Sequence, residues 1–340
     1  MTHRRLDSCF FTLSESRGLA VPVARDAGMA LAALEERRFE DGEFKLRPLE
    51  SVRDRTVFVL QTLAATAEAP ICERLVRLLF LISGLRDAGA SRRIVLVPYL
   101  AFARKERRTQ LRDPVNTRYV AQLLEASGAD RVIALDVHNP AALDNSFRIP
   151  VDHLTALPMM VDHFASRLTQ ARLAIASPDI GGIKRAQIFR ELLEARVGGE
   201  VEFAFIEKRR VQGIVSGGTL VGDVKGREVI VLDDLCATGG TLIRAGDACQ
   251  RAGATAVHAA VTHVPLAAGL EALVRANGVS HIVCTDSVGF SPDLSGASAP
   301  SAPKLTVLSI APLLGQAVRR IVAGKPLEPL FSRWPVAFED

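Results

Sequence analysis

Several kinds of residue are scarce in this 340-residue chain, and each shortage excludes a class of protein. Aromatic residues make up 5% of the chain, and none alternates with the basic runs as in a stacking surface for nucleic acid. The longest strongly apolar stretch, residues 78–85, is too short to cross a bilayer. The apolar residues 9–13 are too few for a signal peptide. We therefore predict no nucleic-acid partner and no membrane association.

Cysteines are few, odd in number and never arranged as Cys-x-x-Cys; they are Cys9, Cys72, Cys236, Cys249 and Cys284. This usage indicates a reduced, cytoplasmic setting rather than a disulfide scaffold. The formal net charge of +4 is only mildly basic and suits small anionic substrates. With 48% hydrophobic residues, the chain can bury the cores of two domains.

One pattern occurs three times: an amphipathic helix, a Gly-Ala break and a β-branched strand. Its strands are residues 94–97, 132–135 and 257–261. Glycine suits the left-handed position after a helix, and continuously apolar strands are typical of parallel sheets. The pattern predicts an α/β protein with two similar, doubly wound domains and mainly parallel sheets.

We predict that the first domain spans residues 1–155 and the second residues 156–305. In residues 305–322 the apolar pattern predicts a strand and a final helix. The segment 306–340 is expected to pack back on the first domain. Residues 288–305 are rich in Ser, Ala, Pro and Gly and predict a mobile surface loop.

The most informative stretch begins with the apolar residues 229–232, which predict a buried strand. Asp233 and Asp234 follow at its expected end, and a helical pattern starts at Leu242. Between them lie five small residues, Ala237, Thr238, Gly239, Gly240 and Thr241.

Glycines in such a turn let backbone N–H groups close on an anion, and a helix N-terminus adds partial positive charge. The hydroxyls of Thr238 and Thr241 can donate to the same anion, while the paired aspartates can accept from a sugar diol. A plain glycine-rich turn is the alternative. The twin aspartates favour phosphoribosyl binding, and the segment resembles the signature loop of the type I phosphoribosyltransferase superfamily.

Near the N-terminus, Phe39, Asp41 and Glu43 stand at alternate positions around Gly42. In an extended chain they would share one face, where the ring could stack on a purine. Without further context, a strand end with an Asp-Gly turn is the better interpretation.

Basic residues follow the predicted strand 94–97, among them Arg104 and Lys105. Cations at the carboxyl end of a strand suit a polyphosphate, and a solvated basic turn is the alternative. His138 follows the strand 132–135 and could ligate a metal, polarise a phosphate oxygen or cap the sheet. Asp179 precedes a Gly-Gly turn and could equally be a helix N-cap.

After the predicted strand 203–206 come Lys208 and Arg210. The glycine-rich stretch 213–222 that follows could move as a lid.

The order of these motifs, over roughly residues 39–331, resembles the ribose-phosphate pyrophosphokinase family, also called phosphoribosyl pyrophosphate synthetases. The motifs in order are Phe-x-Asp-Gly-Glu, Ala-Arg-x-x-Arg, Asp-x-His, Ser-Pro-Asp-x-Gly-Gly-x-x-Arg-Ala, Lys-Arg-Arg and the Asp-Asp loop. The resemblance implies transfer of the β,γ-pyrophosphoryl group of ATP to the 1-hydroxyl of ribose 5-phosphate, with Mg²⁺ as cofactor.

The resemblance also implies residue roles. Contacts to ATP are assigned to Phe39, Asp41, Gly42, Glu43, Arg104 and Lys105. The positions associated with Mg²⁺ are His138 and Asp179, and the catalytic cations are Lys208 and Arg210. Ribose 5-phosphate is assigned to Asp233, Asp234, Ala237, Thr238, Gly239, Gly240 and Thr241.

In this family the Phe-x-Asp-Gly-Glu segment serves a neighbouring subunit, which implies a homo-oligomer built from dimers, with a hexamer as one option. The sequence departs from the family at Lys105, at Ala237 and in the segment 141–147 after His138. Two alternatives remain open: a phosphoribosyltransferase, and a non-catalytic regulatory subunit that resembles a synthetase.

Overall fold

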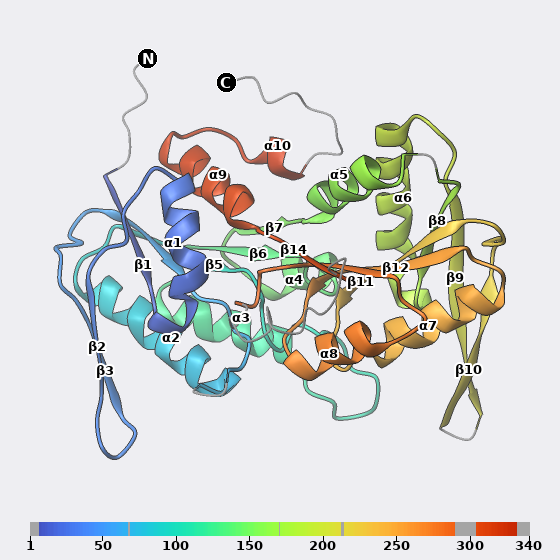
Figure 1. Cartoon of the computed structure of the whole chain (residues 1–340). Helices are drawn as coiled ribbons and strands as arrows, with labels where there is room; N and C mark the ends of the chain where they lie inside the picture. The colour runs from blue at the N-terminus through green and yellow to red at the C-terminus, as the bar shows by residue number, and fades with distance from the viewer. Residues whose placement is uncertain (1–6, 67–68, 170, 212–213, 290–303, 332–340) are drawn as a thin grey trace. The chain divides into compact units, whose positions relative to one another are not determined.

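A computed structural model describes residues 7–66, 69–169, 171–211, 214–289 and 304–331 (Figure 1). The chain divides into two compact units. Within the described ranges, unit 1 comprises residues 7–155, 287–289 and 309–331, and unit 2 comprises residues 156–286 and 304–308. None of the helices found in these ranges has the length and apolar character needed to span a membrane.

Unit 1 contains a five-stranded parallel sheet in the order β1-β4-β5-β6-β7. The strands are β1 (Ser8–Thr12), β4 (Thr56–Leu60), β5 (Arg92–Val97), β6 (Arg131–Leu135) and β7 (Val151–Leu154). Every residue of β4 is buried, so both faces of this strand are covered. That double coverage is why the strand reads as a continuous apolar run.

The helices of unit 1 are α1 (Arg17–Asp26), α2 (Ile71–Asp87), α3 (Asn116–Ser127), α4 (Pro140–Ser146), α9 (Ala311–Val322) and α10 (Glu328–Phe331), with a 3₁₀ turn at Ser14–Ser16. Although far apart in sequence, α1 and α9 lie side by side (Figure 1). An added Cβ on Gly315 would lie only 2.6 Å from the Cβ of Asp26. The last long helix therefore packs closely on the first.

A hairpin of β2 (Leu34–Arg38) and β3 (Phe44–Pro48) stands apart from the main sheet of unit 1 (Figure 1). The strand pair contacts α2 next to its turn, because Phe44, which pairs with Arg38, lies with its ring 5.3 Å from that of Phe80. Arg77 of α2 also forms ion pairs with Glu15 and with Glu36 of the hairpin. The hairpin is thus held against α2 from its middle up to the pair beside the turn, and the turn itself is exposed.

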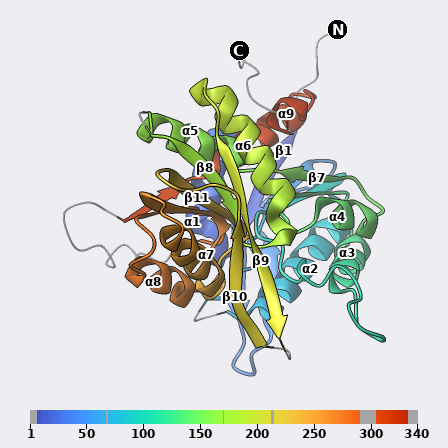
Figure 2. The ribbon, with the colours of Figure 1, turned by 90° about the vertical axis from the view of Figure 1, so that its right-hand side faces the viewer.

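Unit 2 contains a seven-stranded sheet in the order β10-β9-β8-β11-β12-β13-β14. The strands are β8 (Leu173–Ser177), β9 (Glu202–Val211), β10 (Ile214–Val221), β11 (Glu228–Leu235), β12 (Ala256–His263), β13 (His281–Thr285) and β14 (Leu305–Leu308). All pairings are parallel except β9 with β10. Figure 2 shows β9 and β10 as one long two-stranded ribbon.

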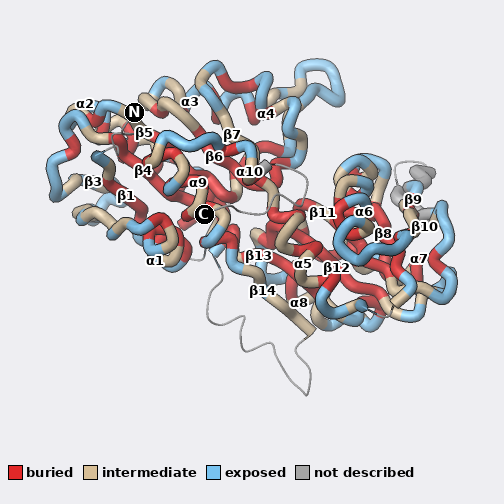
Figure 3. Tube along the Cα trace, turned by 90° about the horizontal axis from the view of Figure 1, so that it is seen from above, coloured by how far each residue is buried: buried red, intermediate tan, exposed pale blue. Residues whose placement is uncertain are grey.

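The helices of unit 2 are α5 (Leu157–Arg167), α6 (Ile183–Val197), α7 (Gly240–Arg251) and α8 (Ala267–Arg275), with a 3₁₀ turn at Ile180–Gly182. The pair α5 and α6 covers one face of the sheet, and α7 and α8 cover the other (Figures 1 and 2). Burial follows the strands in both units (Figure 3). The predicted α/β class with mainly parallel sheets is confirmed.

The three predicted helix–strand repeats are present as α2–β5, α3–β6 and α7–β12, and the predicted strand and helix of residues 305–322 are β14 and α9. Of the glycine-rich stretch 213–222, which we expected could move as a lid, residues 214–221 form the strand β10. Residue 213 of that stretch, and 290–303 of the predicted mobile loop, lie outside the described residues.

Candidate active site

The paired aspartates lie near the carboxyl end of β11, in the middle of the unit 2 sheet between β8 and β12. Asp234 is buried and donates its backbone N–H to Asp233 Oδ1 at 2.9 Å. Arg185, from the first turn of the neighbouring helix α6, contacts both carboxylates. Its Nη1 lies 2.9 Å from Asp234 Oδ1 and 3.9 Å from Asp233 Oδ1. One guanidinium thus holds two acids together.

Burial and the neighbouring carboxylate raise the pKa of Asp233 well above its usual value. Desolvation is the largest cause, the negative charge of Asp234 is the next, and Arg185 opposes both. The negative charge of Asp179 raises the same pKa further. Close carboxylates of this kind accept hydrogen bonds from adjacent hydroxyls, as a sugar diol would offer.

The loop after β11 leads directly into a helix. Gly239 has a φ of +77° and caps α7, which begins at Gly240. The first helical bond runs from the Ile243 N–H to the Gly239 carbonyl at 3.0 Å. The amides of the first turn therefore have no intrahelical acceptor and point outward, as in a typical anion site. Thr238 is exposed beside them.

The start of α8 supports this loop from behind. An added Cβ on Gly269 would lie 2.4 Å from the carbonyl oxygen of Ala237, and one on Gly239 would lie 2.9 Å from the carbonyl oxygen of Gly269. Backbone is therefore packed against backbone on both sides. Only glycine fits at Gly269 without moving the loop.

Asp179 serves as an N-cap, because its Oδ1 accepts from the Gly182 N–H at 3.1 Å at the start of the 3₁₀ turn. This confirms the capping alternative. A role of Asp179 at the site stays a prediction, and its negative charge contributes to the raised pKa of Asp233. Asp179, Arg185, Asp233 and Asp234 are thus brought together within unit 2. Arg185 was not among the predicted site residues, although it stands in the Arg-Ala part of the quoted motif, six residues after Asp179.

Lys208 and Arg210 lie within β9 rather than after it, since this strand is longer than predicted. Their backbones pair with β10, Lys208 opposite Gly218 and Arg210 opposite Val215. The ladder is irregular between these two pairs. The side chains of both residues lie outside the described part of the structure.

In unit 1 the Phe39–Glu43 segment forms the turn of the β2–β3 hairpin. The Phe39 N–H donates to the Glu43 carbonyl at 2.8 Å, the Glu43 N–H donates to Asp41 Oδ1 at 3.0 Å, and Gly42 has a φ of +92°. The extended arrangement with a shared face is therefore wrong, and the Asp-Gly turn is correct. The Phe39 ring is 38% exposed and lies 4.9 Å from the guanidinium carbon of Arg37, so it remains open to a ligand.

The basic segment after β5 is a loop in which Arg104 is exposed. Lys105 instead turns inward and forms an ion pair with Asp113. Asp113 Oδ2 also accepts from the Thr109 hydroxyl at 2.7 Å and from the Gln110 N–H at 3.0 Å. The ion pair of Lys105 with Asp113 therefore joins two parts of the same loop, a contact that the sequence did not predict.

His138 is exposed just beyond the carboxyl end of β6. Asp136 and Val137 before it are fixed: Asp136 Oδ1 accepts from the Thr155 hydroxyl at 2.7 Å, and the Val137 N–H donates to His153 Nε2 at 3.0 Å. His138 belongs to unit 1 and Asp179 to unit 2. Among the described residues, no group of three or more His, Cys, Asp or Glu side chains could hold a metal by itself.

Comparison with known proteins gives two family matches. Residues 8–128 match the N-terminal domain of ribose phosphate pyrophosphokinase, and residues 151–290 match the phosphoribosyl transferase domain. The chain belongs to the ribose-phosphate pyrophosphokinase family. This confirms the predicted resemblance and the predicted class of enzyme.

The similarity extends over nearly the whole of each relative. Ribose-phosphate pyrophosphokinase 1 of Streptococcus pneumoniae is 33% identical over 96% of this chain and 97% of its own length. Ribose-phosphate pyrophosphokinase of Maricaulis maris is 37% identical over 90% of this chain and 94% of its own length. The crystal structure of phosphoribosylpyrophosphate synthetase from Mycobacterium smegmatis matches with a TM-score of 0.83 at 31% identity, covering 94% of this chain and 99% of that one.

Proposed function

We propose that this protein is a ribose-phosphate diphosphokinase that transfers the β,γ-pyrophosphoryl group of ATP to the 1-hydroxyl of ribose 5-phosphate, releasing AMP. The observation that carries the proposal is the Asp233–Asp234 pair, held by Arg185 and followed directly by the N-terminus of α7. This arrangement offers acceptors for a diol and donors for a phosphate in one loop, in a chain that matches pyrophosphokinases along nearly its whole length.

Ribose 5-phosphate would bind to unit 2. Asp233 and Asp234 accept hydrogen bonds from its 2- and 3-hydroxyls, and the backbone and hydroxyl groups of 237–241 donate to its phosphate. Because charge-assisted bonds are the strong ones, Arg185 supports sugar binding by favouring the ionised form of the aspartates and by orienting both carboxylates. Such positioning accounts for much of catalysis in phosphoryl transfer.

ATP would bind through the hairpin turn and the loop after β5. The exposed Phe39 ring offers a stacking surface for adenine, the carboxylates of Asp41 and Glu43 offer acceptors for its amine, and Arg104 offers a donor for phosphate oxygens. Lys105, which the sequence assigned to ATP, would have to leave Asp113 to reach a nucleotide. Exposure of the turn fits a role towards a neighbouring subunit, so we keep a homo-oligomer built from dimers as part of the proposal.

Lys208 and Arg210 would stabilise the negative charge that develops on the oxygen bridging to AMP. Their place on the long β9–β10 ribbon supports this role, because such a two-stranded ribbon extends beyond the helices that cover the sheet (Figure 2). Closure of the ribbon over bound substrates would exclude water and prevent hydrolysis of ATP.

The side chains at the proposed site supply part of the ligand set of Mg²⁺. Asp179 offers hard carboxylate oxygen, and the lack of a complete cluster among the described residues suits an ion that takes its other ligands from water and phosphates. When bound, Mg²⁺ would neutralise charge on the phosphate oxygens. Asp179 would hold it, with His138 as the second associated position.

Two further predictions remain part of the proposal. The first is the division of the chain into three parts at residues 155 and 305, and the second is a cytoplasmic location. Support for the first comes from the two compact units, and support for the second comes from five cysteines that are all unpaired.

One experiment separates the proposed activity from its two rivals. Purified protein is incubated with ATP, ribose 5-phosphate and Mg²⁺, and AMP is measured, with the sugar phosphate omitted in a parallel reaction. AMP formation that depends on ribose 5-phosphate supports the proposal. No AMP in either reaction would point to a regulatory subunit or to a phosphoribosyltransferase, and the transferase would instead consume ready-made phosphoribosyl pyrophosphate.

A further inference from the structure

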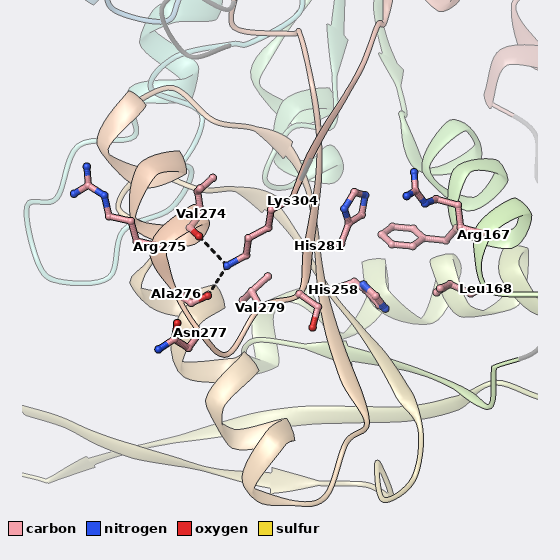
Figure 4. Close-up of a pocket in the computed structure, with 12 residues that line it drawn as sticks. Arg167, Leu168, His258, Val274, Arg275, Ala276, Asn277, Val279, His281 and Lys304 are labelled. Carbon is pink, nitrogen blue, oxygen red and sulfur yellow. Dashed lines mark hydrogen bonds between the residues drawn. The ribbon is translucent and has the colours of Figure 1, made fainter. Parts of the chain in front are cut away.

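A second pocket of about 550 Å³ lies in unit 2, near the amino ends of its strands (Figure 4). Its walls come from the end of α5, the end of α8 and the starts of β12, β13 and β14. The strand register separates it from the aspartates, because His258 on its wall pairs with Ile230, whereas Asp233 pairs with Val261. The volume falls within the range typical of small-molecule sites.

The charge of the pocket has one sign. Its lining includes Arg167, Arg275 and Lys304 and not one aspartate or glutamate. Lys304 Nζ donates to the carbonyls of Val274 and Ala276, at 2.8 and 2.5 Å, and so keeps a cation at the end of α8 (Figure 4). Such a surface selects anions.

The two arginines of the pocket differ in their existing ion pairs. Arg275 contacts Glu271 at 3.4 Å on the surface. Arg167 is exposed, and no ion pair joins it to another residue of the described ranges. A planar guanidinium without a carboxylate partner suits bidentate binding of phosphate.

The third property of the pocket is that planar imidazole rings line it. In the view of Figure 4 the rings of His258 and His281 lie between Lys304 and Arg167. The His281 ring stacks on that of His163 with centroids 5.7 Å apart, and the His258 ring lies 6.0 Å from that of Phe164.

Both pocket histidines are fixed in orientation. His258 Nε2 lies 2.9 Å from Glu228 Oε2, and His281 Nε2 lies 3.2 Å from the Thr306 hydroxyl. Held rings offer contact surfaces at little entropic cost. The His258 and His281 rings stand at 72° to each other, so a planar ligand can stack on one of these rings and meet the other edge-on. A metal does not explain them, because the described residues contain no group of three suitable ligands.

From these three properties we infer that the pocket binds a phosphate ester that carries a planar ring, of the nucleoside monophosphate class. The phosphate contacts Arg167, and the planar ring of the ligand stacks on His281 and meets His258 edge-on. This is a second ligand site, and it does not depend on the proposed reaction. A phosphate without a ring, or a ring without a phosphate, loses one of the two kinds of contact.

Histidine signals give a readout specific to this pocket. Full-length protein labelled with ¹³C in the imidazole rings contains seven histidines, and variants His258→Gln and His281→Gln assign the two signals of interest. AMP is titrated at constant pH, with adenosine and ribose 5-phosphate as comparison ligands. We expect saturable shifts of both signals with AMP, and at least about tenfold weaker binding of adenosine and of ribose 5-phosphate.

The variant Arg167→Glu is expected to weaken AMP binding at this site by about tenfold or more. Arg251→Glu is the matched control, with the same charge change in the same unit outside the pocket, and should leave the affinity within about twofold of wild type. Absence of shifts with AMP, equal affinities of the two variants, or equal binding of ribose 5-phosphate would overturn the inference. AMP formation by the same samples tests the proposed reaction separately.

Discussion

Arg185 Nη1 lies 2.9 Å from Asp234 Oδ1 and 3.9 Å from Asp233 Oδ1, so one cation from α6 holds the two acids at the end of β11. Without this cation the two carboxylates would repel each other, and the pair would retain a proton more strongly. An acceptor pair for a sugar diol would then be weakened. The contact therefore makes Arg185 a positioning residue for the proposed reaction.

Replacing Arg185 with Gln should raise the KM for ribose 5-phosphate by about tenfold, or about 1.4 kcal/mol, with a smaller effect on the KM for ATP. Arg185→Lys should recover part of the loss, since lysine restores the charge but not the planar fork. Steady-state kinetics with each substrate varied in turn gives both constants. The control is Arg196→Gln in the same helix, which removes an exposed pair with Asp162. An equal rise in both KM values would argue against the positioning role.

The raised pKa of Asp233 predicts a pH-dependent stability in the absence of ligand. Above the ordinary aspartate pKa of about 4, and up to the raised value, the folded protein binds more protons than the unfolded chain. The contribution is fully present below that range, and the free energy of unfolding falls as pH rises through it. Asp233→Asn removes the titrating group, so the stability of wild type relative to this variant should decrease as the pH rises above about 5.

Urea unfolding at several pH values checks this prediction, with a slope of up to about 1.4 kcal/mol for each pH unit in the difference between the proteins. Asp144→Asn provides the same change at an exposed carboxylate on α4. Parallel stability curves for wild type and Asp233→Asn would show that Asp233 titrates normally.

Replacing Arg210 with Ala should lower kcat by about two to three orders of magnitude, comparable to the loss of one preorganised donor in a transition state. The KM values should change little, because the interaction forms mainly with the developing charge. The rate of AMP release measures the effect, and Lys225→Ala, an exposed cation in the same unit, is the control. A loss of less than threefold would remove Arg210 from the mechanism.

Gly269→Ala should disturb the phosphate loop, because the added Cβ would lie 2.4 Å from the Ala237 carbonyl oxygen. We expect a loss of about 1–3 kcal/mol in the free energy of unfolding and about tenfold weaker binding of ribose 5-phosphate. Gly84→Ala in α2, where nothing lies within 4 Å of the added Cβ, should be neutral or stabilising. Calorimetric binding and urea unfolding measure the two effects, and wild-type values for Gly269→Ala would disprove the close packing.

Much of the fold was predictable because its elements follow local rules. Residues 94–97 of β5, 132–135 of β6 and 259–261 of β12 are apolar and buried, so their parallel setting could be inferred from residue type alone. The β9–β10 ribbon was missed because glycines within the sequence of β10 resemble a loop. The hairpin turn at Phe39–Glu43 was ambiguous until hydrogen bonds fixed it.

By itself the sequence determined that the acids Asp233 and Asp234 stand near the end of a strand and that small residues follow them before α7. These are properties of consecutive residues, and their order along the chain was enough to indicate the family. Only the tertiary structure decided that Arg185 reaches acids almost fifty residues away, and that His258, His281 and Lys304 share a cationic pocket with Arg167. Such neighbours are set by strand register and helix packing, and side-chain distances of a few ångströms are not encoded in local sequence patterns.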